Sequence, residues 1–438
     1  MTGGTRRQEL RTYSMKTILL RSVNILNPAS AFHRKTADVL IKDGKIAQIS
    51  ESISIGDDEV VMIDGNGKYL SPGFFDLNAN LGEPGYETKE DLITGSAAAA
   101  AGGFTGVAVQ PSTHPPVHTK SDVAYIVNRS RDFITKIYPV GCVSYNREGK
   151  DLAELYDMKL AGAVAFSDGT RPVLDSGLMA RALLYVKGFD GLIFSYPEDS
   201  AIAGSGRMNE GKMSTYLGMK GIPSLAEEVF ISRDLFLAEY NESRVHFSTI
   251  SSAGSVALIR EAKKKGIRVT CDVAAHHLVL TDEALVGFDS NYKVKPPLRT
   301  QKDIDALIGG LEDGTIDAIV SQHTPHEIEF KDVEFEVAAF GIIGLQTVLP
   351  LVLRAGLSPE LLVEKLAVKP REIVNIPVPA FQEGEAADVV LFDPCEEWIF
   401  DESTNQSRSS NSPFLGQQMT GRALMVLNNG RLLAVNNG

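Results

Sequence analysis

Short apolar runs alternate with amphipathic stretches through the middle of the chain, between about residues 71 and 383. In the amphipathic stretches the apolar residues recur with the 3.6-residue period of a helix, as in residues 90–101, 176–187 and 255–265. A strand followed by a helix, repeated eight times, is typical of a (β/α)8 barrel. The predicted barrel strands are residues 73–81, 105–110, 136–143, 162–167, 191–195, 244–249, 268–273 and 318–321.

Both ends of the chain have a different pattern, in which short strands are separated by turns. Asp43-Gly44 and Asn429-Gly430 are hairpin turns, because both residue pairs tolerate positive φ. We expect the strands of the two ends to form one β-sandwich beside the barrel, with residues 405–412 as a polar loop. The predicted domains are a β-sandwich of residues 15–70 and 384–438, a barrel of residues 71–383, and a disordered extension of residues 1–14.

Composition and charge narrow the range of partners. The net charge of −13 argues against nucleic acid and anionic membranes as partners, because neither offers a cationic surface. The chain has no apolar run near the roughly 20 residues of a membrane helix, and its first residues lack the apolar core of a signal peptide. Three scattered cysteines are too few for a disulfide framework. These features predict a cytoplasmic protein.

The first predicted barrel strand lies in the stretch PGFFDLNANLGEPG, at residues 72–85. This stretch resembles the metal-binding opening of the amidohydrolase superfamily, and within it the dihydroorotases, whose motif runs PGxxDxHxH and then LREPG. Asn78 and Asn80 stand where that motif has histidines, and Gly82 stands where it has arginine.

Further motifs extend the resemblance over nearly the whole chain from about residue 17. They include Glu198-Asp199, His276-His277 and the segments 98–105, 162–168, 293–299, 323–326 and 340–344. The resemblance implies a barrel enzyme of pyrimidine biosynthesis that hydrolyses a cyclic amide with zinc.

The positions that the resemblance aligns with the metal ligands carry other residue types. They are Asn78 and Asn80 after the first strand, Tyr196 after the fifth, Thr249 after the sixth and Gln322 after the eighth. Amide and hydroxyl groups are poor zinc ligands compared with imidazole, and an amide cannot act as a general base near neutral pH. We therefore predict a member of the family that lacks the metal ligands and binds no cofactor.

One ligand position is ambiguous. Asp168 lies where the family carries a bridging acid, but the segment Ser167-Asp168-Gly169-Thr170 lacks the family's second aspartate. The alternative interpretation is that Asp168 caps a helix or loop. Asp168 could also combine with His323 and His326 in a new metal site, although hydrogen-bonded core and loop histidines are the simpler interpretation.

The resemblance also implies positions that contact the substrate. His326 matches a substrate-contacting histidine of the family, while Ser112 and Lys295 stand where the family has asparagines. Gly82 removes the arginine that would pair with a substrate carboxylate.

We expect a catalytically inactive, homodimeric protein that acts as a structural or regulatory partner of aspartate carbamoyltransferase, as known inactive relatives do. The alternative is an active cyclic-amide hydrolase, of the dihydroorotase, hydantoinase or allantoinase type, with a rebuilt site. A third hypothesis is a sensor that binds a small molecule at the barrel mouth.

Overall fold

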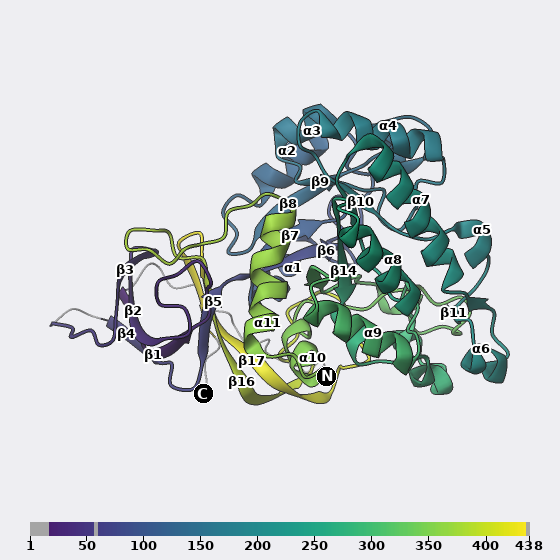
Figure 1. Ribbon diagram of the computed structural model, residues 1–438. Coiled ribbons are helices and arrows are strands. Elements are labelled where there is room, and N and C mark those ends of the chain that lie inside the picture. Colours follow the sequence, from purple (N-terminus) through teal and green to yellow (C-terminus); the bar gives the residue numbers. More distant parts are fainter. Residues whose placement is uncertain (1–16, 57–59, 435–438) are drawn as a thin grey trace.

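The computed structural model describes residues 17–56 and 60–434, so the predicted disordered extension lies outside the described residues (Figure 1). Eight parallel strands form a ring in chain order, which confirms the predicted barrel. The ring closes at its mouth, where Asn80 N donates to His323 O (2.8 Å). The barrel strands are β6 (Phe74–Ala79), β7 (Phe104–Val109), β8 (Lys136–Gly141), β9 (Ala165–Phe166), β10 (Ile193–Ser195), β13 (Val245–Phe247), β14 (Val269–Ala274) and β15 (Ala318–Val320).

Helices surround the ring, and several begin at a residue whose side chain caps the first turn. The Asp91 carboxylate accepts from Ile93 N and Thr94 N, and Thr119 forms a capping box with Asp122. The barrel helices are α1 (Leu92–Ala101), α2 (Lys120–Arg129), α3 (Leu155–Ala161), α4 (Ser176–Lys187), α7 (Leu225–Asn241), α8 (Ala253–Lys264), α9 (Gln301–Glu312), α10 (Val348–Arg354), α11 (Pro359–Val363) and α12 (Lys369–Ile373), with a π-helical turn, η6 (Glu364–Val368), between the last two.

The connections after the fifth and seventh barrel strands carry extra structure. The connection after β10 holds α5 (Ser200–Ala203), β11 (Met208–Asn209), α6 (Lys212–Leu217) and β12 (Gly221–Ile222). The connection after β14 holds the 3-10 turns η2 (Ala275–Leu278), η3 (Asp282–Gly287) and η4 (Ser290–Tyr292); two more such turns, η1 (Tyr145–Arg147) and η5 (Ile328–Phe330), lie in other loops.

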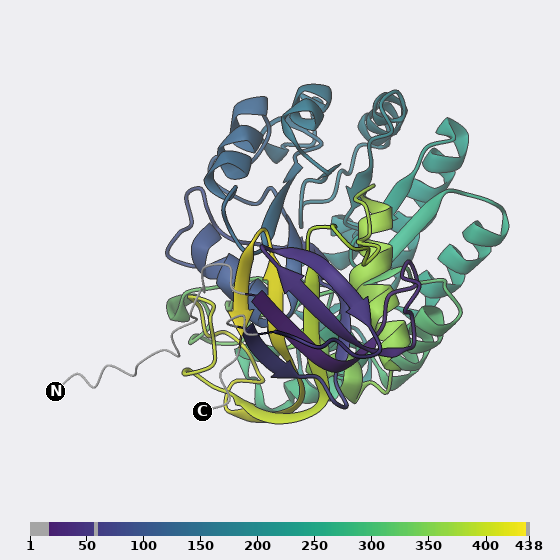
Figure 2. The same ribbon diagram turned by 90° about the vertical axis from the view of Figure 1, so that its left-hand side faces the viewer.

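The two chain ends form one eight-stranded sheet beside the barrel, and the N-terminal and C-terminal strands lie side by side in it (Figures 1 and 2). β5 joins them, because it pairs with β1 on one side and with β16 on the other. The strands are β1 (Thr17–Ile25), β2 (Thr36–Lys42), β3 (Lys45–Ser50), β4 (Val60–Asp64), β5 (Tyr69–Pro72), β16 (Val389–Phe400), β17 (Gln417–Asn428) and β18 (Arg431–Ala434).

The two chain ends join beside the barrel as expected, in a single sheet. The sheet is continuous, and its own core draws on strands from both chain ends. β4 and β5 both run parallel to β1. They lie on the side of β1 opposite to β2 and β3, so the chain crosses β1 after β3. The predicted domain limits stay a prediction; only Gly73 separates β5 from β6.

The predicted polar loop of residues 405–412 packs against the barrel. Asn405, Ser407, Ser409 and Asn411 are all buried. Their polar groups are satisfied there, since the Asn411 amide donates to Thr324 O (3.0 Å) beside the barrel mouth. The loop therefore buttresses the loop that follows β15.

Candidate functional site

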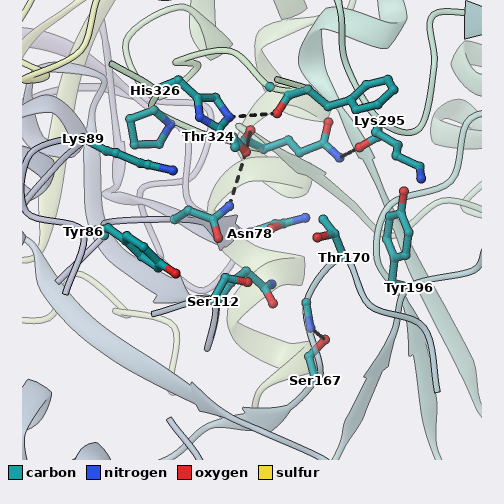
Figure 3. A pocket seen from close by; sticks show the side chains of 18 of the residues that line it. Asn78, Tyr86, Lys89, Ser112, Ser167, Thr170, Tyr196, Lys295, Thr324 and His326 are labelled. Carbon is teal, nitrogen blue, oxygen red and sulfur yellow. Dashed lines mark hydrogen bonds between the residues drawn. The ribbon is translucent and has the colours of Figure 1, made fainter. Parts of the chain in front are cut away.

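A cavity of about 450 Å³ opens at the C-terminal ends of the barrel strands, where (β/α)8 enzymes place their active sites (Figure 3). Residues at the end of β6 or after β6, β7, β9, β10, β13, β14 and β15 line it. The fold thus brings together most of the positions predicted from the sequence, although they are scattered along the chain. Those that line the cavity are Asn78, Asn80, Gly82, Ser112, Tyr196, Lys295, Gln322 and His326.

Asn78 and Thr249 bond to each other. The Asn78 amide donates to the hydroxyls of Thr249 and Ser248, both at 3.3 Å. The Thr249 hydroxyl donates in turn to Asp272 (2.6 Å), whose second oxygen lies 2.9 Å from Nε2 of the buried His246. The buried Asp272 carboxylate is therefore already hydrogen-bonded through both of its oxygens.

Asn80 and Gln322 are also held by neighbouring groups. The Asn80 amide donates to the Thr324 hydroxyl (3.3 Å) and to His323 O (3.4 Å). The Gln322 amide donates to Lys295 O (2.9 Å). Both side chains are thus fixed by bonds between loops at the mouth.

Tyr196 and Gln110 each keep a buried polar atom without a partner. Their side chains line the cavity and are 7% and 5% exposed, yet neither the Tyr196 hydroxyl nor Gln110 Oε1 has a hydrogen-bond partner in the described structure. Burial, with the nearby Glu198 carboxylate, raises the pKa of Tyr196 well above its usual value. Tyr196 is therefore a neutral phenol and can donate a hydrogen bond into the cavity.

Asp168 faces away from the cavity. Its carboxylate accepts from Val143 N (2.9 Å), from Ser144 N (3.0 Å) and from the Ser144 hydroxyl. Burial raises the pKa of Asp168, and the bonds from Ser144 oppose that shift. The structure therefore gives Asp168 the capping role, on the loop after β8.

The three predicted substrate contacts line the cavity, but two have protein partners. Lys295 Nζ lies 2.8 Å from Glu198 Oε1, and His326 Nε2 donates to Phe340 O (2.9 Å). Burial lowers the pKa of His326 to about 4, so its imidazole is neutral at physiological pH and its unpartnered Nδ1 is an acceptor. Ser112 completes this group on the loop after β7.

Gly82 occupies a tight turn of the loop after β6. Its φ is +70°, and a Cβ there would lie 2.4 Å from Glu90 O and 2.6 Å from Tyr86 O. Such distances lie far inside van der Waals contact, so the loop has no room for a side chain at this position in its present conformation.

The donor set at the mouth does not fit a zinc ion, which the family resemblance implies. Zinc sites in proteins use imidazole, thiolate and carboxylate ligands. The five aligned positions offer amides, a phenol and a hydroxyl, and none of the residues that line the cavity is a carboxylate. Within residues 17–56 and 60–434, no three His, Cys, Asp or Glu side chains gather closely enough to hold a metal ion.

The alternative metal site would draw on His323, His326 and Asp168. His323 is buried with Nε2 3.3 Å from Glu90 and with Nδ1 accepting from Gly344 N. His326 bonds a carbonyl, and Asp168 faces another loop. The three side chains therefore do not converge on one point.

Several lining residues were not singled out from the sequence. They include Gln110 and Ser248, together with Tyr86, Lys89, Thr170 and Thr324, which Figure 3 labels. Position offered a signal, since Gln110 and Ser248 lie at the C-terminal ends of the predicted strands 105–110 and 244–249, the ends that form the mouth. Tyr86 and Lys89 lie on a loop, and only tertiary folding brings that loop over the cavity.

The part of the chain that the structure describes contains no helix long and apolar enough to cross a membrane.

Comparisons with known proteins agree with this architecture. The family described as "Dihydro-orotase-like" matches residues 67–255. The dihydroorotase of Syntrophus aciditrophicus is 44% identical over 421 residues, 95% of this chain and 99% of that protein. The dihydroorotase of Acetivibrio thermocellus is 42% identical over 402 residues, 90% of this chain and 94% of that protein.

Among solved structures, the L-hydantoinase of Arthrobacter aurescens matches with a TM-score of 0.84 at 25% identity, over 95% of this chain and 96% of that one. The dihydropyrimidinase of Brevibacillus agri matches with a TM-score of 0.80 at 22% identity, over 96% and 95%, and shares the fold. Sequence and structure agree over nearly the full length of both kinds of relative. The chain therefore belongs to the dihydroorotase family, on an amidohydrolase-type barrel flanked by a sheet from both chain ends.

Proposed function

We propose that this dihydroorotase-like protein does not hydrolyse a cyclic amide, and that it acts as a structural or regulatory partner of aspartate carbamoyltransferase. One observation carries the first part. The side chains at the ends of β6, β13 and β15 are amides and hydroxyls that hydrogen-bond to one another and to the backbone.

Hydrolysis of a cyclic amide needs an activated water and a base. A bound zinc ion lowers the pKa of its water from about 15.7 to about 7, and a positioned base contributes about 10²- to 10⁴-fold. Asn78, Asn80 and Gln322 supply neither function, since an amide is a weak ligand for zinc and does not take up a proton near neutral pH. The nearby Asp272 is held by His246 and Thr249.

Zinc content and turnover test this part together. We expect elemental analysis of the protein, purified with zinc present, to find less than about 0.1 zinc per chain. Structural and catalytic zinc sites bind tightly, so a formed site would keep its metal through purification. Dihydroorotase turnover should stay at background in both directions, and the double variant Asn78→His/Asn80→His should not restore it. Stoichiometric zinc with metal-dependent turnover would instead establish the alternative, an active hydrolase with a rebuilt site.

The partnership is supported by the integrity of the fold. All eight barrel strands and the flanking sheet are complete, so the chain keeps the surfaces on which a family-specific partner could assemble. A stable contact should bury at least about 1,000 Å². We expect aspartate carbamoyltransferase to co-purify with the protein from its own cells, and light scattering to show a larger particle when the two are mixed. No change in the size or activity of the carbamoyltransferase would remove this role.

A second function, binding of a small polar molecule without metal, is favoured by the unpartnered groups of the mouth. The Tyr196 hydroxyl can donate and Gln110 Oε1 can accept, while Lys89 has no carboxylate within 4 Å in the described residues. A cyclic ureide that carries a carboxylate complements these three groups. Calorimetric titration with dihydroorotate should show binding to the wild type and weaker binding to Tyr196→Phe, whereas no heat at millimolar ligand would exclude it.

A further inference from the structure

The outward face of α7 carries a row of exposed apolar side chains. Leu225, Val229, Phe236 and Tyr240, which we name the α7 stripe, are 52%, 42%, 72% and 85% exposed. Their spacing of four, seven and four positions puts them on one face of the helix. The buried residues of α7 lie on the opposite face, so the stripe takes no part in the barrel core.

The neighbouring helix extends this surface. α4 packs beside α7, which lies on the outside of the barrel (Figure 1), and Ser243 after α7 donates to Leu183 O of α4 (2.9 Å). Leu184 of α4 is 58% exposed, and Leu174, whose carbonyl accepts from Arg233 at the middle of α7, is 56% exposed.

The exposed area is large for a protein surface that stays in water. Aromatic side chains present about 150–250 Å² each, and with the aliphatic residues the six side chains expose roughly 700 Å² per copy. The largest apolar patch of a typical monomer is about 300–600 Å². Two such surfaces together would bury roughly 1,400 Å², which is within the range of a specific interface.

The stripe is symmetric about its own centre. Leu225 and Tyr240 are equidistant from the midpoint between Ser232 and Arg233, and so are Val229 and Phe236. When two such helices pack antiparallel across a two-fold axis at that midpoint, Leu225 of one copy faces Tyr240 of the other, and Val229 faces Phe236. Each large aromatic ring then meets a smaller aliphatic side chain, which is the self-complementarity that a two-fold interface needs.

We propose that the α7 stripe is the contact surface for a second copy of this chain, and that the two α7 helices pack antiparallel across a two-fold axis. The proposal specifies the surface of the expected homodimer. It does not rest on the proposed function, because α7 is outside the cavity and the packing is the same whether or not the mouth catalyses a reaction.

Charges at the edge of the stripe make the association depend on salt. Glu228 and Glu239 lie on one side of the stripe, so the two-fold axis brings Glu239 of one copy near Glu228 of the other. On the other side, Arg233 is already paired with Asp234 of its own helix. Like charges at a solvated rim repel weakly and are screened by salt, so dimerisation should strengthen from about 50 mM to about 500 mM salt.

Sedimentation of the full-length protein tests the surface. We expect a dimer at about 50 µM, and at least a tenfold weaker association for Phe236→Glu, because the change places a charge against Val229 of the other copy. Tyr216→Glu on α6 is the matched control: Tyr216 is an aromatic that is 75% exposed but lies off the stripe. It should leave the dimer intact, and circular dichroism should show both variants folded.

Crossed cysteines test the register. In a Cys395→Ser background, which removes the exposed native thiol, Val229→Cys mixed with Phe236→Cys should form a disulfide dimer faster than either variant alone. A wild-type monomer at about 50 µM would overturn the proposal, as would a dimer unaffected by Phe236→Glu. A third outcome would also overturn it: the wild type is a monomer, and Phe236→Glu abolishes its binding to aspartate carbamoyltransferase. Another protein, and not a second copy, would then occupy the stripe.

Discussion

At the scale of single residues, Asp76 is a buried acid whose pKa is shifted by its surroundings. It is fully buried on β6 and accepts from Ser321 N (3.0 Å) and from the Ser321 hydroxyl. Burial raises the pKa of Asp76 from 3.8 to about 7, although the bonds from Ser321 oppose the shift. The folded protein therefore holds a proton on this carboxyl that the unfolded chain releases between about pH 4 and pH 7.

This shift predicts a pH-dependent stability with a defined sign. A carboxyl whose folded pKa is raised binds its proton more tightly in the native state, so its contribution to stability falls as pH rises from about 4 to about 7 and is constant above that. We expect Asp76 to cost the wild type about 2 kcal/mol of unfolding free energy between pH 5.5 and pH 7.5. Asp76→Asn should remove this difference.

Urea titrations of the wild type and Asp76→Asn at the two pH values measure this change in unfolding free energy. Comparing the slope of unfolding free energy against pH for the two proteins isolates Asp76 from other titrating groups. Asp157→Asn, at an exposed position on α3, is the control and should keep the wild-type slope. Equal slopes for the wild type and Asp76→Asn would show that the carboxyl titrates alike in the folded and unfolded states.

At the scale of elements, the loop after β6 has closed over the position where the family motif has arginine. Gly82 adopts φ +70°, its carbonyl accepts from Tyr86 N (2.9 Å), and the backbone atoms Glu90 O and Tyr86 O occupy the space of a Cβ. An arginine at position 82 would therefore need a different conformation of this loop, in addition to the change of one side chain.

We predict that Gly82→Ala destabilises the protein by about 2–4 kcal/mol, because it adds overlap with backbone to the cost of positive φ. Gly67→Ala is the matched control: Gly67 has φ +77° with open space around its Cβ position, so the change should cost only about 1 kcal/mol. Urea unfolding of both variants measures the difference. Equal losses would mean that the loop opens readily to admit a side chain.

At the scale of the whole molecule, one buried arginine ties the barrel to the flanking sheet. Arg371 of α12 donates to Gly73 O (2.6 Å) and to the Thr105 hydroxyl (2.9 Å), at the start of β6 and β7. It also pairs with Asp388 (3.2 Å), just before β16, and its side chain is 2% exposed. Asn428 of β17 adds a second tie, since its amide donates to Thr105 O (3.0 Å).

Arg371→Leu should therefore lower the unfolding free energy by about 3–5 kcal/mol, because it removes the charge partner of Asp388 and the donor to the buried carbonyl of Gly73. Arg260→Leu, which breaks the exposed pair with Asp313, should cost at most about 1 kcal/mol. Calorimetry would record the change in Tm, and the wild type should unfold in one transition. A wild-type scan with two separate transitions would contradict the view that this joint couples barrel and sheet.

The sequence by itself determined the barrel, its eight strands and the sheet of both chain ends. Strand and helix periodicity depends on which side chains are buried, and that is a local property of the pattern. The sequence also located most positions of the mouth, such as Asn78, Tyr196 and Gln322, because strand ends of a barrel meet at one face.

Tertiary structure alone decided which groups point into the mouth and which are already bonded. Asp168 follows a barrel strand as Tyr196 does, yet its carboxylate turns to Val143 and Ser144, because these backbone amides would otherwise be buried without a partner. In the polar loop of residues 405–412, Asn405, Ser407, Ser409 and Asn411 are buried for the same reason, since their polar groups find partners across the chain. Hydrogen bonds between residues far apart in sequence leave no periodic trace, so only the folded chain reveals them.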